Sequence, residues 1–170
     1  MLADVVAACA AVGPVFIVGP PDLVIEPATV VPDPGGGQGN AVRVGLDVAS
    51  LAAASSGRAG PLVVVNADLP CVIARDLLAL AGAVPQGGLA YAPAPDGTTN
   101  ALGLSSPDVF APVYGPGSAA RFAGLGPSHR VDAPNLMDDI DTIDDLERLS
   151  ARLGPHTRSV FATLHTDAAA

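Results

Sequence analysis

The fold is decided by a stretch in the middle of the chain, Leu62-Val63-Val64-Val65-Asn66-Ala67-Asp68-Leu69-Pro70. Its first four residues are continuously apolar, which is typical of a strand that is buried on both faces of a sheet. Asp68 follows at the carboxyl end of this strand, and Pro70 begins the connection to the next helix. The stretch therefore predicts an α/β fold in which a buried strand carries a carboxylate to the ligand-binding edge of the sheet.

Further apolar runs lie on both sides of this strand, at 15–18, 29–31, 88–92 and 100–104. Segments of helical length, rich in Ala and Leu, lie between or after them at 41–54, 74–83 and 142–153. This alternation predicts a three-layer α/β sandwich with a mostly parallel sheet. With 170 residues in all, we expect one domain over 1–160 and a poorly ordered Ala-rich tail at 161–170.

The charge of the chain excludes several functional classes. Seventeen acidic and eight basic residues give a net charge of −9, which repels a polyanion, so no nucleic-acid partner is expected. All eight basic residues are Arg, and the absence of Lys from the sequence excludes Schiff-base chemistry and the lysine of P-loop proteins. Any bound phosphate must be met by a metal ion, Arg or backbone amides.

Other composition features favour a cytoplasmic protein that does not interact with a membrane. Cys9 and Cys71 lack the spacing of a zinc site or a disulfide framework. The uncharged segment 5–21 is interrupted by Gly and Pro, so we expect neither a signal peptide nor a membrane span. The three histidines are isolated and are expected at the surface: His129, His156 and His165.

A second acidic segment supports a metal site. Asp139 and Asp141 alternate around Ile140, and residues two apart in an extended segment face the same way. Because Mg²⁺ prefers oxygen ligands and is held by carboxylates together with substrate phosphates, Asp68, Asp139 and Asp141 are the candidate metal ligands. The alternative is helix capping, by Asp68 for a helix beginning near 73–75 and by Asp141 or Thr142 for the helix that follows. Capping accounts for Thr142, Asp144 and Asp145, but it does not account for the alternation of Asp139 and Asp141.

Three glycine-rich segments could bind anions. The segment 33–41 follows a strand and opens a helix, and the backbone amides of such a loop can approach a nucleotide closely. It matches neither a Rossmann fingerprint nor a Walker A motif, and a surface turn is the alternative. The segments 96–100 and 114–121 offer hydroxyls, glycine amides and one Arg to a phosphate or carboxylate. The candidate nucleotide-binding residues are Gly35, Gly36, Gly37 and Asn40, and the candidate substrate-binding residues are Thr98, Thr99, Asn100, Gly115, Ser118 and Arg121.

In order and spacing, five segments of the chain together resemble the guanylyltransferases of coenzyme F-420 biosynthesis: 33–41, 64–70, 97–102, 115–121 and 139–146. The resemblance implies a nucleotidyltransferase fold of the glycosyltransferase-A-like type. It also implies an enzyme that joins GTP to phosphoenolpyruvate or 2-phospho-L-lactate and releases pyrophosphate. The family's metal-binding aspartates match Asp68, Asp139 and Asp141. Its acid-binding positions match Asn100, Gly115 and Ser118, with Thr in some members at position 100. Phe122 replaces a His that is common in the family.

The main departure from the family is at the amino terminus, because Met1 matches a position well inside the family's first helix. The family's first strand and the basic loop after it, which contributes to nucleotide binding, have no counterpart, so the sheet is expected to lack a central strand. A start codon assigned too late is the explanation that we favour, because residues 1–6 read like the interior of an amphipathic helix. A short and impaired product is the alternative.

Two other functions compete with this interpretation. One is a nucleotidyltransferase of the same fold that acts on a molybdenum cofactor, and the segment 115–121, which resembles a pocket for a small acid, argues against it. The other is a catalytically silent nucleotide-binding module, which the missing amino-terminal loop keeps open. The bacterial members of the family favour phosphoenolpyruvate as the acceptor, and a homodimer is left open.

Overall fold

The computed structural model describes the backbone of residues 1–167 and the side chains as far as Leu164. The elements are, in chain order, α1 (Leu2–Ala10), β1 (Phe16–Gly19), β2 (Thr29–Pro32), α2 (Gln38–Ser55), β3 (Leu62–Val65), α3 (Ala74–Gly82), β4 (Leu89–Pro93), β5 (Thr99–Leu104), η1 (Pro107–Val109), α4 (Ser118–Ala123), β6 (Ser128–Arg130), α5 (Pro134–Met137), α6 (Ile143–Leu149) and α7 (Pro155–Asp167).

The five strands and three helices expected from the sequence are all present, with small shifts at their ends. The helix expected at 142–153 differs most, because α6 ends at Leu149 and α7 begins at Pro155. The segment 161–167, expected to be a poorly ordered tail, is helical as part of α7. Residues 168–170 of that tail and the side chain of His165 lie outside the described residues.

The described strands form a four-stranded sheet with the order β3-β5-β4-β6 and a separate pair, β1-β2. β1 and β2 run parallel, as do β4 and β6, while β5 is antiparallel to both β3 and β4. β3, β4 and β6 thus share one direction, and β5 is reversed because a tight turn joins it to β4, with the amide of Ala94 donating to Thr98 O.

Helices cover both faces of the four-stranded sheet, which gives the three layers expected from the sequence. Side chains alternate between the two faces, so Ala90 and Ala92 of β4 join one buried cluster while Leu89 and Tyr91 join the other. The first cluster is completed by residues of α1, α3 and α5, and the second by residues of α2, η1 and α4. The continuous apolar character of β4 and β5 thus reflects burial on both faces. β3, which was expected to be buried, is half-buried because it lies at the edge of the four-stranded sheet.

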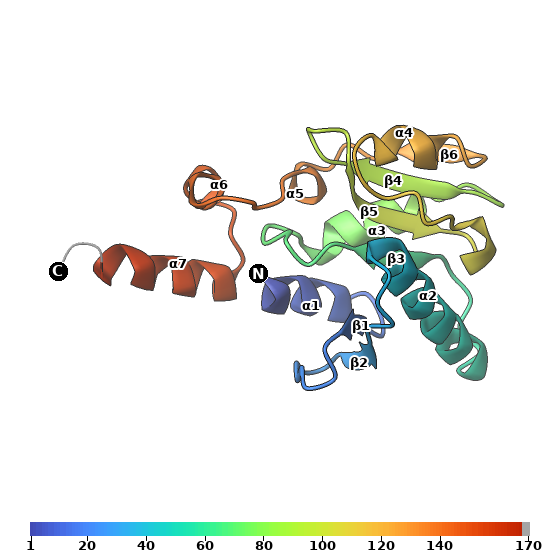
Figure 1. Ribbon diagram of the computed structural model, residues 1–170, viewed down its shortest axis with the longest axis horizontal. Helices are drawn as coiled ribbons and strands as arrows, with labels where there is room; N and C mark the ends of the chain where they lie inside the picture. The colour runs from blue at the N-terminus through green and yellow to red at the C-terminus, as the bar shows by residue number, and fades with distance from the viewer. Residues whose placement is uncertain (168–170) are drawn as a thin grey trace.

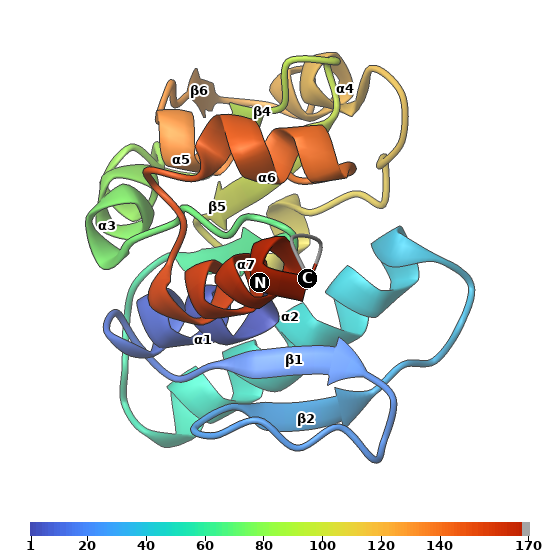
Figure 2. The same cartoon turned by 90° about the vertical axis from the view of Figure 1, so that its left-hand side faces the viewer.

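Helix α2 connects the two sheets, because it packs against both β1 and β3. Figure 2 shows β1 and β2 side by side, with their arrows in the same direction, at the opposite end of the molecule from β4 and β6. Figure 1 shows α7 extending away from the body of the molecule, beyond α1. Within residues 1–167, no helix combines the length and the apolar character needed to cross a membrane.

The two ends of the chain are joined by one buried carboxylate. Asp4 of α1 is 4% exposed and accepts four hydrogen bonds from the first turn of α7. The amide and ring Nδ1 of His156 contact Asp4 Oδ1, and the amide and hydroxyl of Thr157 donate to Asp4 Oδ2. Asp4 therefore caps α7 from a distant part of the sequence.

Candidate functional site

The two acidic segments meet at the carboxyl end of β3. The amide of Ile140 donates to the carbonyl of Asp68 at 3.2 Å, which places Asp139 and Asp141 beside Asp68. Ile140 itself is buried against Cys71, Leu149 and Leu153, so its side chain anchors the acidic segment in the core. The proximity of Asp68 to Asp139 and Asp141, which the sequence predicted, is thus built into the backbone.

The pKa values of two of these carboxyls are raised. Burial is the largest cause of the raised pKa of Asp68, and the negative charges of Asp139 and Asp141 add to it. Burial likewise raises the pKa of Asp139, with a further contribution from the charge of Asp141. Asp68 Oδ1 is buried and finds no hydrogen-bond donor among the described residues. The site therefore concentrates negative charge that the surrounding protein leaves partly uncompensated.

Within the described residues, no group of three or more His, Cys, Asp or Glu side chains is placed to hold a metal ion. Asp68, Asp139 and Asp141 are therefore neighbours without forming a preassembled cage of three ligands. A cage of that kind is not required for Mg²⁺, which usually takes one or two carboxylates and completes its coordination with water and substrate phosphates. The arrangement could hold such an ion together with a phosphate-bearing ligand.

Helix capping does not explain Asp68. The helix that follows it, α3, has Ile73 as its N-cap residue, and the amide of Ile73 donates to the carboxylate of Asp76. At α6, the side chain of Thr142 accepts from the amide of Asp145, and Asp145 accepts from the amide of Thr142 in return. The prediction that capping accounts for Thr142 and Asp145 is confirmed, which leaves Asp68 and Asp139 without a capping role.

Asn100 joins three parts of the site. This residue of β5 is 2% exposed, and its side-chain amide donates to Met137 O at 3.1 Å, just before the acidic segment. The main-chain carbonyl of Asn100 accepts from the main-chain amide of Asn66 at 2.9 Å, at the end of β3. The side chain of Asn66 accepts in turn from Gln38 Nε2 at 3.0 Å, at the start of α2. This chain of hydrogen bonds connects the start of α2 to Met137, just before the acidic segment.

The segments 96–100 and 114–121, both predicted to bind anions, also meet. Ser118 of α4 is fully buried and donates to Thr99 Oγ1 at 3.1 Å, and the amide of Ala119 donates to Gly97 O at 3.1 Å. Thr98 bonds instead to Asp96 within the turn. Thr99, Asn100 and Ser118 are buried, whereas Thr98 and Gly115 are partly exposed.

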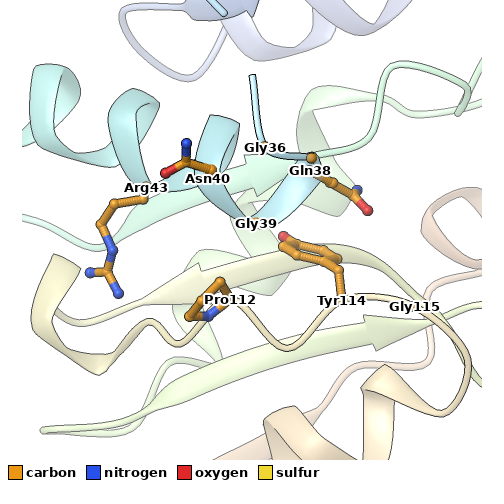
Figure 3. A pocket seen from close by; sticks show the side chains of 9 residues that line it. Gly36, Gln38, Gly39, Asn40, Arg43, Pro112, Tyr114 and Gly115 are labelled. Carbon is orange, nitrogen blue, oxygen red and sulfur yellow. The ribbon is translucent and has the colours of Figure 1, made fainter. Parts of the chain in front are cut away.

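A pocket of about 580 Å³ lies between the start of α2 and the loop before α4. Figure 3 shows Gln38, Asn40 and Arg43 on one side of it and Pro112, Tyr114 and Gly115 on the other. The close approach of these two walls requires a glycine at position 39, because an added Cβ would lie 2.6 Å from Pro112 Cβ. The lining residues are Gly36, Gly37, Gln38, Gly39, Asn40, Arg43, Pro112, Tyr114 and Gly115.

The predicted nucleotide-binding residues divide into two groups. Gly36 and Gly37 line the pocket in left-handed conformations, with φ of 83° and 89°, which only glycine adopts easily. Gly35 shapes the loop, because its amide donates to Asp33 Oδ1 and its carbonyl accepts from Asn40 Nδ2. The glycine-rich segment is thus a structured wall of the pocket.

Arg121, predicted as a ligand for phosphate or carboxylate, is engaged by the protein itself. Its guanidinium donates to the carbonyls of four successive residues, Val113, Tyr114, Gly115 and Pro116, at 2.7–3.3 Å. These bonds hold the loop that carries Tyr114 and Gly115 against the pocket. Arg121 therefore shapes the loop 113–116 in this structure.

Several residues of the site were missed by the sequence reasoning. Gln38 and Asn66 connect the motifs, but isolated amides in turns carry no distinctive pattern. Arg43 lines the pocket from a position that reads as ordinary helix, and Tyr114 was not singled out within the segment 114–121. The position of Asn66, directly after the apolar run, was the one available signal.

Comparison with known proteins decides the family. The chain is 35% identical over 147 residues to a phosphoenolpyruvate guanylyltransferase from Sphaerobacter thermophilus, a match that covers 80% of this chain and 69% of the relative. Relatives of the same name from Geodermatophilus obscurus and Streptomyces scabiei are 32% and 30% identical, over 95% and 96% of this chain and 76% and 80% of theirs. The chain belongs to the phosphoenolpyruvate guanylyltransferase family. No general family model matches the sequence.

Solved structures agree with the fold of this family member. A protein from Desulfovibrio desulfuricans described as a nucleotide-diphospho-sugar transferase superposes with a TM-score of 0.67 at 20% identity, over 98% of this chain and 79% of that one. A hypothetical transferase from Thermus thermophilus gives a TM-score of 0.52 at 20% identity, over 86% and 85% of the two chains. The fold class expected from the sequence, a three-layer α/β nucleotidyltransferase fold, is thus confirmed.

Proposed function

We propose that this protein is a guanylyltransferase that joins GTP to phosphoenolpyruvate and releases pyrophosphate, as the names of its relatives suggest. The observation that carries the proposal is the hydrogen-bond network that unites the five motifs at one edge of the sheet. It runs from Gln38 through Asn66 and Asn100 to Met137. The bond from Ile140 to Asp68 adds the acidic segment, and the bond from Ser118 to Thr99 adds the segment 115–121. 2-Phospho-L-lactate is the alternative acceptor of the same chemical class.

Mg²⁺ is the metal that fits the carboxylates of the site. Asp68 supplies a buried oxygen without a donor among the described residues, and Asp139 supplies a second carboxylate whose charge is poorly compensated. Oxygen ligands of this kind suit a hard cation, and the nucleotide phosphates would complete its coordination. Asp141 is the third proposed ligand. When bound, the cation neutralises the charge that develops on the phosphate oxygens during the transfer.

The residues of the pocket would position the two substrates. The nucleotide is placed against Gly36 and Gly37, where the backbone of the loop allows close approach. The acceptor acid is placed at Thr98 and Gly115, which are more exposed than the buried side chains of the same segments. The acceptor phosphate then attacks the α-phosphorus of GTP in line with the departing pyrophosphate. A reaction of this type depends on positioning and electrostatics rather than on a protein nucleophile.

The test is pyrophosphate release from a mixture of the protein, GTP, Mg²⁺ and one acceptor acid at a time. Release that requires both Mg²⁺ and phosphoenolpyruvate supports the proposal. Release with 2-phospho-L-lactate alone moves the acceptor to that acid. Binding of GTP without release in either mixture contradicts the proposal and indicates a silent nucleotide-binding module.

A further inference from the structure

A pair of arginines holds the acidic segment from the side opposite the proposed metal. Asp138, the residue before Asp139, accepts from Arg148 Nη1 at 3.0 Å and from Arg152 Nη2 at 2.5 Å. The side chain of Asp138 is 18% exposed, whereas those of Arg148 and Arg152 are 51% and 39% exposed. We call Asp138, Arg148 and Arg152 the arginine clamp.

The clamp extends to the other end of the acidic segment. Arg148 Nη2 also contacts Asp145 Oδ1 at 3.0 Å, and Asp145 Oδ2 accepts from the amides of Asp141 and Thr142 at 3.3 and 3.0 Å. One guanidinium therefore bridges two carboxylates that fix the backbone before Asp139 and at Asp141. The planar, forked donors of Arg suit this bridge, whereas the point charge of Lys does not.

The clamp is also anchored to the helix that follows Asp68. Arg152 Nη1 donates to Asn135 Oδ1 at 3.0 Å, and Asn135 Nδ2 donates to Asp76 Oδ2 at 3.0 Å. The carboxylate of Asp76 in turn accepts from the amide of Ile73 at the start of α3. The acidic segment is thus tied by polar contacts to the element that begins just after Asp68.

The side chains of this segment alternate between two sides. Asp138 faces the arginines and Ile140 enters the core, while Asp139 and Asp141 occupy the alternate positions beside Asp68. We propose that Arg148 and Arg152 are positioning residues, which act through Asp138 and Asp145 to hold Asp139 and Asp141 in place for a divalent cation. This inference rests on the proposed function, because it assumes that these carboxylates bind the metal.

A positioning role and a purely electrostatic role of the arginines predict opposite changes in the affinity for a cation. If the arginines acted through their charge alone, replacing them with neutral residues would strengthen the binding of a cation nearby. If they position the carboxylates, the same replacement weakens binding, because residues that orient metal ligands are typically worth about 10 to 100-fold in metal affinity. The direction of the change therefore separates the two effects.

The experiment measures the dissociation constant of Mn²⁺ for the whole protein by isothermal titration, with Mn²⁺ alone as the probe. We expect Arg148→Gln combined with Arg152→Gln to raise this constant by about tenfold or more. The pair Arg148→Lys and Arg152→Lys keeps both charges and should also raise it, because Lys cannot bridge two carboxylates. Arg130→Gln is the matched control, since Arg130 pairs with Asp132 at the exposed surface and should leave the constant unchanged.

Circular dichroism and thermal unfolding of each variant identify any loss of the fold, and affinities are compared between folded proteins. Tighter or unchanged Mn²⁺ binding by the folded Gln variant would overturn the positioning role while leaving the metal site intact. If the wild-type protein shows no Mn²⁺ binding, or if its Mn²⁺ binding persists in Asp68→Asn, the metal site itself is overturned, and the role of the clamp with it. The two failures are therefore distinguishable.

Discussion

The amide of Ile140 donates to the carbonyl of Asp68 across 3.2 Å, and this bond joins the two acidic segments of the site. Because the bond lies in the backbone, Asp139 and Asp141 are brought to Asp68 whatever their own side chains do. The bond places these carboxylates close together, and burial and the neighbouring negative charges raise the pKa values of Asp68 and Asp139. Such a charged cluster is stabilised when a cation binds it.

Replacing Asp68 with Asn should abolish Mg²⁺-dependent turnover while leaving the fold intact. The substitution removes a buried charge, so the melting temperature without metal should be unchanged or higher. Thermal unfolding and pyrophosphate release measure the two effects. Asp47→Asn, at an exposed position of α2, is the control for loss of one carboxylate. A marked loss of stability together with full activity of the folded fraction would show that Asp68 is a structural residue.

Metal binding should weaken as the pH falls, beginning above the range where an ordinary aspartate titrates. The reason is that Asp68 and Asp139 have raised pKa values, so protons compete with the cation at a higher pH than usual. The stability of the metal-free protein should change in the opposite direction. It should rise as the pH falls through these raised pKa values, because protonation relieves the buried charges of the folded state. Mn²⁺ titrations from pH 7 downward measure the effect. Affinity that stays constant to pH 4 would contradict it.

Arg121→Lys should impair the enzyme nearly as much as Arg121→Gln. Both substitutions remove most of the bonds to the carbonyls of the loop 113–116, and we expect the KM for the acceptor acid to rise while that for GTP changes less. The loss of stability should be about 1–2 kcal/mol, from the unfolding midpoint in urea. If Lys retains the wild-type KM, the positive charge of Arg121 contacts the acid directly.

Asp4→Asn should destabilise the protein by about 2 kcal/mol, because an amide cannot accept all four hydrogen bonds from His156 and Thr157. Burial alone would raise the pKa of Asp4, but the bonds from Thr157 and His156 outweigh it and lower the pKa. The contribution of Asp4 is therefore present above the ordinary aspartate pKa and is lost as the pH falls through the lowered value. Unfolding measured at pH 7 and pH 3 should show the mutational difference shrink at the lower pH. Asp22→Asn, at an exposed position, is the control.

The fold was largely predictable because the strands in the middle of its main sheet, β4 and β5, are buried on both faces, and β3 beside them is equally apolar. β3 and β4 are continuous apolar runs with clear boundaries, so their positions followed from the sequence. β6 was missed, since its three residues, Ser128 to Arg130, are polar and carry no strand pattern. The reversed direction of β5 was also not foreseen, because it depends on the turn from Ala94 to Thr98 and not on the composition of the strand.

The motifs of the site were predictable, but the orientation of several side chains was not. Arg121 looked like a free cation in the sequence, and its four carbonyl partners became apparent in the folded loop. Asp138 was not singled out in the sequence, because its partners Arg148 and Arg152 lie 10 and 14 residues later in the chain. Hydrogen-bond partners that are distant in sequence leave no local pattern.

The α/β class, the family resemblance and the candidate carboxylates Asp68, Asp139 and Asp141 could all be read from the sequence. Apolar runs are local patterns that burial on two faces imposes directly, and an acidic residue just after such a run marks the ligand-binding edge of the sheet. The tertiary structure alone decided that Asn100 connects the motifs, that Asp4 caps α7, and that Asp138 is turned toward two arginines. These features depend on bringing distant backbone segments within hydrogen-bond distance, which the packing of the helices on the sheet controls.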